Sequence, residues 1–292
     1  MGYNLPKISI VTPNYNGAAY LEETILSVLN QKYPNLEYII VDGGSSDDSL
    51  EIIKKYEQEL ACWISEPDRG MYDAIQKGFN RSTGEIMAWI NSDDMYHKNV
   101  FYTIADVFSS FKQVNWLVGA TTIYDEQSRT VATYQSRAFT KFDFYNYDFK
   151  WIQQESVFWR RIIWEKSGSS LNTNLKYAGD FDLWLKFFQA DRLFIMNALI
   201  GGFRYHSTGQ LSRDFLKEYL YEANQSIRQV PITKGERKYM FKYKTLIRLE
   251  LFFKRIKLVN AAWLIRVYRS KFFYQSPTIT FDRESGKFEL SE

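Results

Sequence analysis

The stretch ISIVTPNYNGAAYLEETILSVLNQKYPNLEYIIVDGGSSDDS, from Ile8 to Ser49, contains a complete strand–helix–strand unit. The apolar run Ile8–Val11 is followed by a loop, and apolar residues then recur at helical spacing between Leu21 and Leu29. A second apolar run, Leu36–Val41, ends in a turn whose paired glycines allow unusual backbone angles and whose Ser and Asp side chains can cap a helix near Ser49. This alternation predicts parallel strands joined by a helix.

The same rhythm continues as far as about residue 115. The run CWIS (Cys62–Ser65) leads into a helix expected over residues 72–81, and EIMAWI (Glu85–Ile90) forms a fourth strand. Strands that alternate with helices predict an α/β fold with a mostly parallel sheet covered on both faces, in which ligands bind beyond the carboxyl ends of the strands. Polar residues follow all four strands at that edge: Asn14, Asp42, Asp68 with Arg69, and Asp93 with Asp94.

Beyond Asn115 the pattern changes. The segments WLVGATTIYD and TVATYQS predict a hairpin, ESVFWRRIIWEKSG predicts a strand leading into a helix, and YAGDFDLWLKFFQA predicts a loop that opens another helix. We therefore expect one domain over residues 1–212, with halves over about 1–115 and 116–212, followed by a mostly helical extension over residues 213–292.

Composition and charge limit the function classes. The chain of 292 residues is 45% hydrophobic, which is enough to bury a sizeable core, and its formal charge of +3 argues against a protein that coats nucleic acid. The single cysteine, Cys62, rules out an internal disulfide framework and predicts a buried strand thiol in a reducing compartment. The N-terminus has no signal-peptide pattern, and no apolar run reaches the length of a membrane span, so we expect a cytoplasmic protein.

The last part of the chain is strongly basic. Between Lys234 and Lys271 there are twelve Lys or Arg residues against two acids, and aromatic and aliphatic residues interleave with these charges. No nucleic-acid reader motif is present. We hypothesise a peripheral helix drawn to anionic lipid at the inner face of the cytoplasmic membrane. The alternative is an appendage that packs its aromatics on the rest of the protein and leaves its lysines in water.

The segment WINSDDMY, Trp89 to Tyr96, places two carboxylates side by side. Adjacent carboxylates repel and raise each other's pKa unless a positive charge sits beside them, and a bound divalent cation is one such charge. The alternative is that Asp93 and Asp94 lie at the N-cap of a helix beginning near Lys98, where Asp is favoured.

Three segments together resemble one family. The opening Ile8–Ser49, the middle SEPDRGMYDAIQKGFNRSTGEIMAWINSDD and the later YAGDFDLWLKF resemble the GT-A-fold glycosyltransferases of family 2, in the bacterial branch that builds capsules and other surface glycans. The similarity is specific over about Lys7 to Phe188. It implies inverting transfer of a sugar from a nucleotide-diphosphate donor to a hydroxyl of a lipid-linked glycan, with Mn²⁺ or Mg²⁺ as cofactor. The half 1–115 would hold the nucleotide sugar and 116–212 the acceptor.

The resemblance also implies which residues bind the donor. They are Thr12, Asn14, Tyr15, Asp42, Asp68, Arg69 and Asp93, and the metal would be held by Asp93, Asp94 and His206. Asp42 could instead shape the glycine-rich turn, Asp73 and Lys77 could form a surface ion pair, and His206 could be structural. The family's commoner form has Asp where this chain has Asn91 and often a second Asp where it has Gly43, so the base of the donor stays open among uracil, guanine and thymine.

For catalysis the resemblance implies that Asp180 is the general base that takes the proton of the acceptor hydroxyl. An acid often precedes this residue in the family, and here Gly179 does. Glu155 and Asp182 are candidates for acceptor binding. Glu155 could equally be a polar residue at a strand edge, and Asp182 could be an acid favoured in the first turn of a helix.

Two other functions are weighed against glycosyl transfer. A nucleotidyltransferase of similar topology needs a glycine-rich, lysine-bearing phosphate loop, which TPNYNGAAY lacks. A catalytically silent nucleotide-sugar or glycan-binding protein would keep the fold without the reaction. The retained Asp42, Asp93 and Asp180 favour the enzyme over this alternative.

Overall fold

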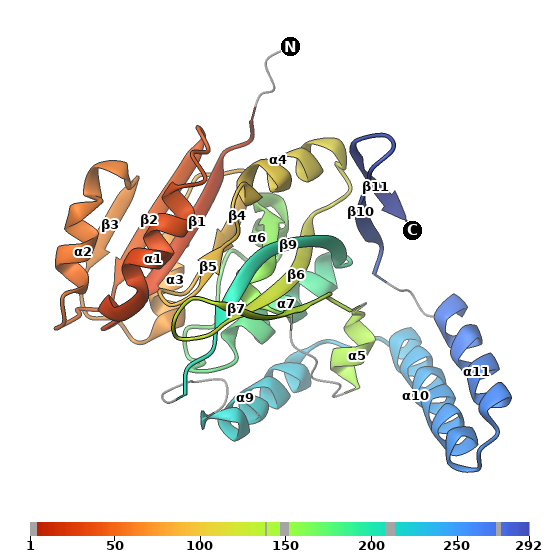
Figure 1. Ribbon diagram of the computed structural model, residues 1–292. Coiled ribbons are helices and arrows are strands. Elements are labelled where there is room, and N and C mark those ends of the chain that lie inside the picture. Colours follow the sequence, from red (N-terminus) through yellow and green to blue (C-terminus); the bar gives the residue numbers. More distant parts are fainter. Residues whose placement is uncertain (1–4, 138, 147–151, 208–213, 273–275, 292) are drawn as a thin grey trace.

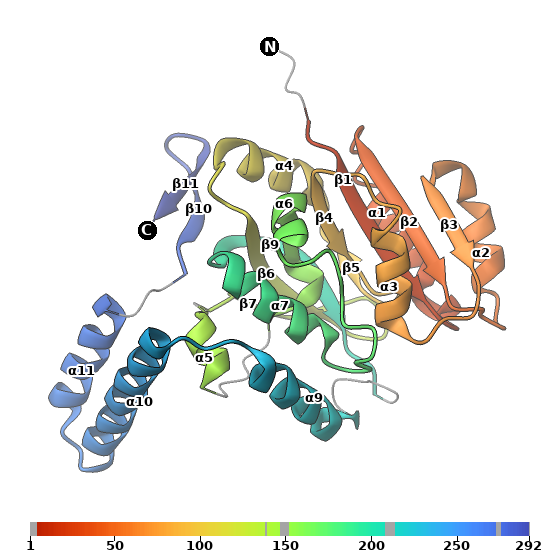
Figure 2. The same cartoon turned by 180° about the vertical axis from the view of Figure 1, so that it is seen from behind.

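The computed structural model describes residues 5–137, 139–146, 152–207, 214–272 and 276–291. Its centre is a single sheet in the order β11-β10-β9-β6-β8-β4-β1-β2-β3, with β5 paired to β9 and β7 paired to β6. Helices cover both faces of this sheet (Figures 1 and 2). The α/β fold expected from the sequence is therefore confirmed.

The N-terminal half of the sheet is entirely parallel, as predicted. It consists of β1 (Ile8–Asn14), β2 (Leu36–Asp42), β3 (Cys62–Ser65) and β4 (Ile86–Trp89). The pairing register sets Asn14 opposite Asp42 and Asp42 opposite Ser65. The three polar residues therefore meet at the carboxyl edge of the sheet.

The next five strands along the chain make the sheet mixed rather than mostly parallel. They are β5 (Met95–Tyr96), β6 (Trp116–Tyr124), β7 (Thr130–Tyr134), β8 (Val157–Arg160) and β9 (Phe194–Arg204). The predicted hairpin of β6 and β7 is confirmed. β8 runs antiparallel to both β4 and β6, whereas β9 is parallel to β6.

The helices divide between the two faces of the sheet (Figures 1 and 2). One face carries α1 (Ala18–Leu29), α2 (Ser49–Lys55) and α4 (Val100–Ser110), and the other carries α3 (Met71–Phe79), α6 (Arg161–Lys166) and α7 (Gly179–Ala190). α3 lies very close to β1, since a Cβ atom at Gly78 would be 2.4 Å from Val11 Cγ1. Short elements are the 3-10 turns Glu57–Glu59 and Gln154–Ser156 and the helix α5 (Lys141–Tyr145).

Aromatic side chains fill the centre of the core. Trp89, Trp116, Trp159 and Trp184 are all buried, and the indole of Trp184 stacks on those of Trp89 and Trp116. Burial of such large rings dominates the stability of a core. Cys62 lies in a strand, as predicted, but it is only half-buried because β3 is the edge strand of the sheet.

The C-terminal part contains more than helices. α9 (Leu216–Gln229) lies at the carboxyl edge of the sheet, and α10 (Lys234–Arg255) and α11 (Val259–Phe272) form a hairpin that projects from the domain (Figure 1). β10 (Thr278–Asp282) and β11 (Lys287–Ser291) then return to the central sheet, where β10 pairs in parallel with β9. The sequence analysis anticipated the helices but missed these two strands. None of the described helices is long and apolar enough to cross a membrane.

Candidate active site

The carboxyl edge of the parallel strands brings several predicted residues together. Asn14 Nδ2 donates to Asp42 Oδ1 over 2.8 Å. Asp68 reaches the same edge, because a Cβ atom at Gly43 would lie 2.6 Å from Asp68 Oδ2. The carboxylate of Asp68 thus occupies the space that a second acid at position 43 would need.

Asp42 is buried within its turn rather than exposed at the rim. Ser65 Oγ donates to its Oδ2 over 2.7 Å, and the backbone N–H groups of Gly44 and Ser45 donate to the same oxygen over 3.1 and 3.0 Å. Burial raises the pKa of Asp42, but the bonds from Ser45, Ser65 and Asn14 together hold it below its usual value. With no exposed surface, the carboxylate shapes the glycine-rich turn, which was the alternative for this residue, and its role as a nucleoside contact stays a prediction.

Thr12 and Tyr15 lie near the end of the first strand but differ in exposure. The hydroxyl of Thr12 is buried and hydrogen-bonds with that of Tyr38 over 3.0 Å, so its side chain does not face a ligand. Tyr15 has 68% of its surface exposed beyond β1. Of these two predicted donor contacts, only Tyr15 has a side chain open to the rim.

Asp93 and Asp94 point in different directions. Asp93 Oδ2 lies 2.9 Å from His206 Nε2, and Asp93 is partly exposed. Asp94 is buried, and its Oδ1 accepts a hydrogen bond from the backbone N–H of Arg204 over 2.9 Å. Burial, with the charges of Asp93 and Glu155, raises the pKa of Asp94 well above its usual value. The carboxylate of Asp94 thus binds the backbone of β9 on the side away from His206, and its role as a metal ligand stays a prediction.

The alternative that Asp93 and Asp94 cap the N-terminus of a helix is wrong. α4 begins at Val100, and its N-cap position is taken by Asn99. Asp93 and His206 remain as the pair that could hold a metal. Within the described part of the chain, no three His, Cys, Asp or Glu residues are grouped so as to hold an ion between them.

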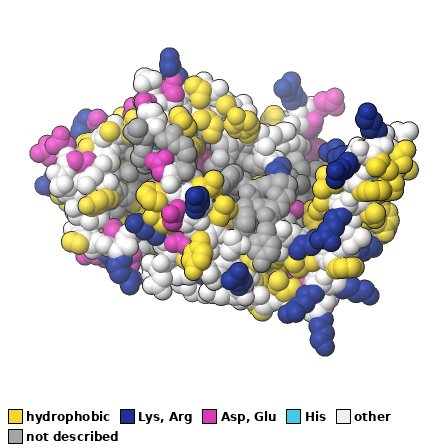
Figure 3. All heavy atoms as spheres, turned by 90° about the horizontal axis from the view of Figure 1, so that it is seen from below, with side chains coloured by type: hydrophobic (Ala, Val, Ile, Leu, Met, Phe, Trp, Pro, Cys, Tyr) yellow, Lys and Arg dark blue, Asp and Glu magenta, His cyan; other side chains and the backbone are white. Residues whose placement is uncertain are grey.

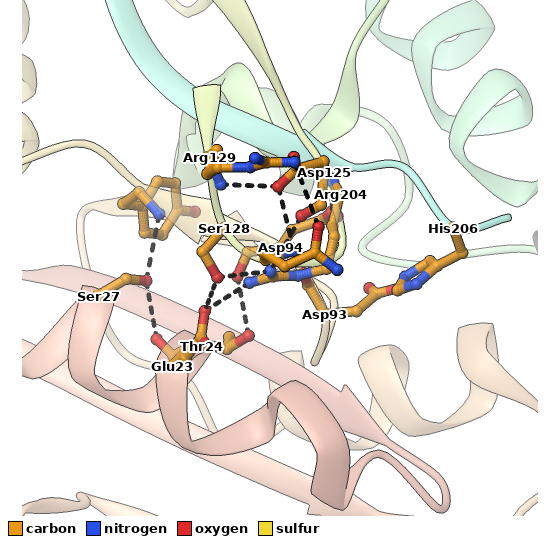
Figure 4. A network of polar contacts seen from close by, with 12 residues as sticks. Glu23, Thr24, Ser27, Asp93, Asp94, Asp125, Ser128, Arg129, Arg204 and His206 are labelled. Carbon is orange, nitrogen blue, oxygen red and sulfur yellow. Dashed lines mark hydrogen bonds and ion pairs between the residues drawn. The ribbon is translucent and has the colours of Figure 1, made fainter. Parts of the chain in front are cut away.

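Arg204 holds the backbone of Asp93 in place (Figure 4). Its Nε donates to the backbone oxygen of Asp93 over 2.7 Å, its NH2 pairs with Glu23 Oε2 at 2.8 Å, and its NH1 donates to Ser128 Oγ over 2.7 Å. The guanidinium also lies 4.3 Å from the centre of the Tyr20 ring. Arg204 is fully buried at the end of β9, so it ties the Asp93 loop to α1 and to the β6–β7 connection. Sequence reasoning missed it, since an arginine after an apolar strand is usually a surface residue.

Asp180 lies in the first turn of α7, beside a tyrosine of α3. Tyr72 Oη is 3.3 Å from Asp180 Oδ1, and a second hydrogen bond comes from the hydroxyl of Tyr219 in α9. Burial raises the pKa of Asp180 to about 6, against the lowering effect of these hydrogen bonds. A carboxylate with a pKa close to neutrality suits a general base.

A steric contact explains why a glycine, Gly179, precedes Asp180. A Cβ atom at Gly179 would lie 2.7 Å from atoms of the Tyr72 ring. An acid at this position would therefore displace Tyr72, and with it one of the hydroxyls on Asp180. In this chain, Gly179 leaves the space that the Tyr72 ring fills.

α9 supports the same segment through its backbone. Glu222 accepts hydrogen bonds from the N–H groups of Lys176, Tyr177 and Ala178 over 3.0, 2.8 and 2.9 Å. The carboxylate thereby binds the chain just before the N-terminus of α7. Tyr219 and Glu222 lie outside the segments that carried the resemblance, so nothing in the sequence singled them out.

Glu155 is buried near Asp93 and Asp180. Among the described residues, none hydrogen-bonds its buried Oε1. Burial and the charges of Asp93 and Asp180 raise its pKa to about 8, so the group is largely protonated at neutral pH. A protonated carboxyl can donate a hydrogen bond as well as accept one.

Four other predicted residues form ordinary ion pairs. Arg69 is exposed and pairs with Asp73 at 2.9 Å, and Lys77 lies 3.7 Å from Asp73 but only 2.8 Å from Glu66. Such exposed pairs contribute little to stability. Asp182 pairs with Lys186, one turn along α7, at 3.0 Å. Its side chain was expected to point in a different direction from that of Asp180. Asp182 is buried in the first turn of α7, which fits the alternative of an acid favoured there, and its role in acceptor binding stays a prediction.

The sequence over residues 9–183 matches the family described as Glycosyl transferase family 2, which is more than half of the chain. The chain belongs to glycosyl transferase family 2. Among related sequences, an uncharacterized glycosyltransferase of Rickettsia prowazekii is 28% identical over 222 residues, which cover 73% of this chain and 69% of that protein. The putative teichuronic acid biosynthesis glycosyltransferase TuaG of Bacillus subtilis is 36% identical over 97 residues, covering 32% of this chain and 38% of TuaG.

Solved structures confirm the GT-A fold of this family 2 glycosyltransferase. TarS residues 1–349 of S. aureus, in complex with UDP-GlcNAc, align with a TM-score of 0.59 at 15% identity over 98% of this chain and 96% of that one. The mannosyltransferase PcManGT of Pyrobaculum calidifontis, in complex with GDP-Man and Mn²⁺, aligns with a TM-score of 0.61 at 17% identity over 93% and 77%. In an alignment with a longer TarS chain, the matched region covers 42% of that TarS chain.

Proposed function

We propose that this glycosyltransferase transfers a sugar, with inversion, from a nucleotide-diphosphate donor to a hydroxyl of a surface glycan, with Asp180 as the general base. The acceptor oxygen attacks the anomeric carbon while Asp180 takes the hydroxyl proton, and the bond from that carbon to the diphosphate oxygen breaks. The observation that carries this proposal is the position of Asp180 in the first turn of α7, with its carboxylate in contact with the hydroxyls of Tyr72 and Tyr219. Its pKa, raised by burial to about 6, supports the same role.

The rim around Asn14, Asp68 and Asp93 is the proposed donor site. Two buried amide oxygens there, Asn14 Oδ1 and Asn91 Oδ1, have no hydrogen-bond partner among the described residues. Buried polar atoms normally have partners, so these two suit a surface whose contacts are completed by a ligand. The exposed guanidinium of Arg69 would contact the diphosphate once it leaves Asp73.

Asp93 and His206 are the proposed metal-binding side chains. Their facing atoms are 2.9 Å apart, and neighbouring ligands of an octahedral Mg²⁺, at about 2.0–2.1 Å from the ion, are separated by roughly 3 Å. Carboxylate oxygens suit Mn²⁺, and a neutral imidazole is a common ligand of metal ions in proteins. When bound, the cation would neutralise the charge that develops on the departing diphosphate.

Glu155 is the proposed contact for the acceptor. Its neutral carboxyl group can accept a hydrogen bond from one sugar hydroxyl and donate to another. The name of TuaG refers to teichuronic acid biosynthesis, which supports a surface polysaccharide as the product. We further propose a lipid-linked acceptor, which would bring the enzyme to a membrane surface.

A binding panel and a turnover assay test this proposal. The panel consists of UDP, GDP and dTDP, each with and without Mn²⁺. We expect one of these nucleotides to raise the melting temperature of the protein only when Mn²⁺ is present. Asp93→Ala should abolish that rise because the metal loses a ligand. With the corresponding nucleotide sugar and a bacterial lipid extract as acceptor, Asp180→Asn should lower nucleotide release by more than about a hundredfold while the nucleotide still binds.

The control for the turnover assay is Asp191→Asn, an acid beyond the far end of α7. Turnover that persists in Asp180→Asn would contradict the assignment of the base. Donor binding without turnover in the wild type would favour the silent nucleotide-sugar binder instead.

A further inference from the structure

The outer face of α10 combines cations with aromatic rings. Phe241 and Phe252 have 72% and 55% of their surface exposed, and Lys238, Arg248 and Arg255 are exposed beside them. These five residues recur at spacings of three, four and seven positions, which places them on one side of a helix. Figure 3 shows hydrophobic and basic side chains side by side over this end of the molecule.

The acidic residues of α10 lie on its opposite side. Glu236, Tyr243 and Glu250 recur at a spacing of seven, and all three make contacts toward the protein. Glu236 pairs with Lys141 of α5, and Glu250, which is buried, pairs with Arg269 of α11 at 3.0 Å. The carboxylates of α10 are thus used within the fold, and its outer face is left with cations as its charged groups.

The turn between α10 and α11 is apolar and exposed. It lies at the end of the hairpin far from the central sheet (Figure 1). The apolar side chains of the turn and of the adjoining ends of both helices have between 45% and 66% of their surface exposed: Phe252, Ile256, Leu258, Val259 and Trp263. Arg255 and Lys257 flank them. A cluster of this kind is unusual on a protein surface in contact with water alone.

We propose that the hairpin of α10 and α11 binds an anionic lipid bilayer, with its apolar turn inserted in the interface and the cations of α10 against the headgroups. Aliphatic and aromatic side chains ringed by Lys and Arg are the chemistry of an interfacial helix. This turns the hypothesis made from the basic sequence into a specific surface, because the structure separates the outward cations from the inward acids.

The charges of the hairpin disfavour two other occupants. A second copy of the chain, docked about a two-fold axis, would bring basic face against basic face, and like charges across an interface repel. A nucleic acid would leave Ile256, Leu258 and Val259 without a match, since bases stack on aromatic rings rather than on aliphatic side chains. An anionic bilayer satisfies both the charges and the aliphatic side chains.

Vesicle co-sedimentation of the full chain tests the proposal. Vesicles of phosphatidylcholine alone are compared with vesicles that also contain phosphatidylglycerol, at low and high salt. We expect binding to the anionic vesicles only. Phe252→Ser combined with Trp263→Ser should weaken it by more than about tenfold, and Arg248→Gln combined with Arg255→Gln by roughly fivefold for each cation removed.

Matched controls come from exposed residues elsewhere. Val131→Ser with Tyr134→Ser removes apolar side chains of β7 that are 58% and 62% exposed, and Arg283→Gln with Lys287→Gln removes two cations near the β10–β11 turn. Both controls should bind vesicles as the wild type does. Melting temperature and nucleotide binding should be the same in all variants, so a failure of the lipid proposal is distinguishable from a failure of the proposed reaction.

Three results would overturn the proposal. They are equal binding to neutral and anionic vesicles, hairpin variants that bind like their controls, and no vesicle binding by the wild type at all. Sedimentation velocity on the same proteins identifies the competing occupant: a wild-type dimer that the Phe252→Ser and Trp263→Ser variant converts to a monomer would assign the surface to a second copy.

Discussion

The hydroxyl of Tyr72 lies 3.3 Å from a carboxylate oxygen of Asp180, while the ring of Tyr72 fills the space beside Gly179. One side chain therefore has two roles in the same place. Its ring leaves no room for a larger residue before Asp180. Its hydroxyl shares its proton between the backbone oxygen of Tyr177, at 2.9 Å, and Asp180. A larger residue at position 179 of this chain would require the Tyr72 ring to move.

Tyr72→Phe should move the pH dependence of the reaction. The hydrogen bonds from Tyr72 and Tyr219 stabilise the charged form of Asp180, so removing one raises the pKa of Asp180 above its present value of about 6. Because the base must be deprotonated, the acid limb of kcat/KM should shift to higher pH. We expect a severalfold loss near pH 6 and little change near pH 8.

The control for this profile is Tyr56→Phe, which removes a hydroxyl that donates to Glu22 over 2.7 Å away from the proposed site. Its profile should match the wild type. An unshifted acid limb in both Tyr72→Phe and Tyr219→Phe would show that neither hydroxyl influences the base.

Glu155→Gln should stabilise the protein increasingly as pH rises. The pKa of Glu155 is raised to about 8 in the folded state, so in the wild type the unfolded chain releases this proton at a lower pH than the folded protein does. The contribution of the neutral group to stability is complete below the unfolded pKa of about 4.3 and is lost between there and about pH 8. Gln does not titrate, so the difference in melting temperature should widen across that window.

The melting experiment is made with a metal chelator, since a bound cation would also act on Glu155. Glu51→Gln, on the exposed side of α2, is the control and should give a difference that does not vary with pH. A constant difference for Glu155→Gln would mean that its carboxyl ionises normally.

Arg204→Lys should weaken the use of metal more than the chemical step. Lysine keeps the charge but cannot reach the backbone oxygen of Asp93, Glu23 and Ser128 together, so Asp93 loses its anchor. Groups that orient metal ligands typically contribute 10–100-fold to metal affinity. We expect the Mn²⁺ concentration for half-maximal rate to rise by about that factor, with most of kcat restored at saturating Mn²⁺.

Arg129→Lys is the matched control, because Arg129 pairs with Asp125 in the same connection but does not touch Asp93. It should leave the Mn²⁺ requirement unchanged. A uniform loss of kcat in Arg204→Lys, without a change in that requirement, would assign Arg204 to general stability instead of positioning.

Gly179→Ala should destabilise the protein by about 1–3 kcal/mol, because the added methyl group would overlap the Tyr72 ring. Gly235→Ala is the control in the first turn of α10, where a Cβ atom would meet only Thr233 Oγ1 at 4.0 Å. That change should be neutral or slightly stabilising. Chemical denaturation measures both, and equal effects would contradict the steric account of Gly179.

The parallel half of the fold was predictable from the sequence, and so was the place of its polar residues. Runs such as Ile8–Val11 and Leu36–Val41 carry their own signal, and the carboxyl ends of parallel strands must meet. The directions of Asp93 and Asp94 were not predictable in the same way. The two residues lie at a turn, where the N–H of Asp94 donates to the backbone oxygen of Asn91. Which of them faces solvent depends on β9, which lies about a hundred residues later in the chain.

The partners of the base were out of reach for a different reason. Tyr72 appears in the sequence as one more apolar residue on the buried face of α3, and Tyr219 and Glu222 belong to a helix that carries no motif. Their roles arise only when α3, α7 and α9 meet at one edge of the sheet. The role of a single residue within a motif could be predicted from the sequence, whereas a role shared by residues of distant elements could be recognised only in the folded structure.

The return of the chain to the sheet at β10 changes what the basic segment is. Because β10 pairs with β9 and Ile279 is buried there, the hairpin of α10 and α11 is anchored on both sides, as an excursion between two parts of one sheet. A truncation after Thr233 would therefore strip a strand from β9 and uncover an edge able to recruit strands from other molecules. Genetic dissection of this region calls for an internal excision that keeps β10 and β11, so that loss of the excursion is not confused with loss of the sheet.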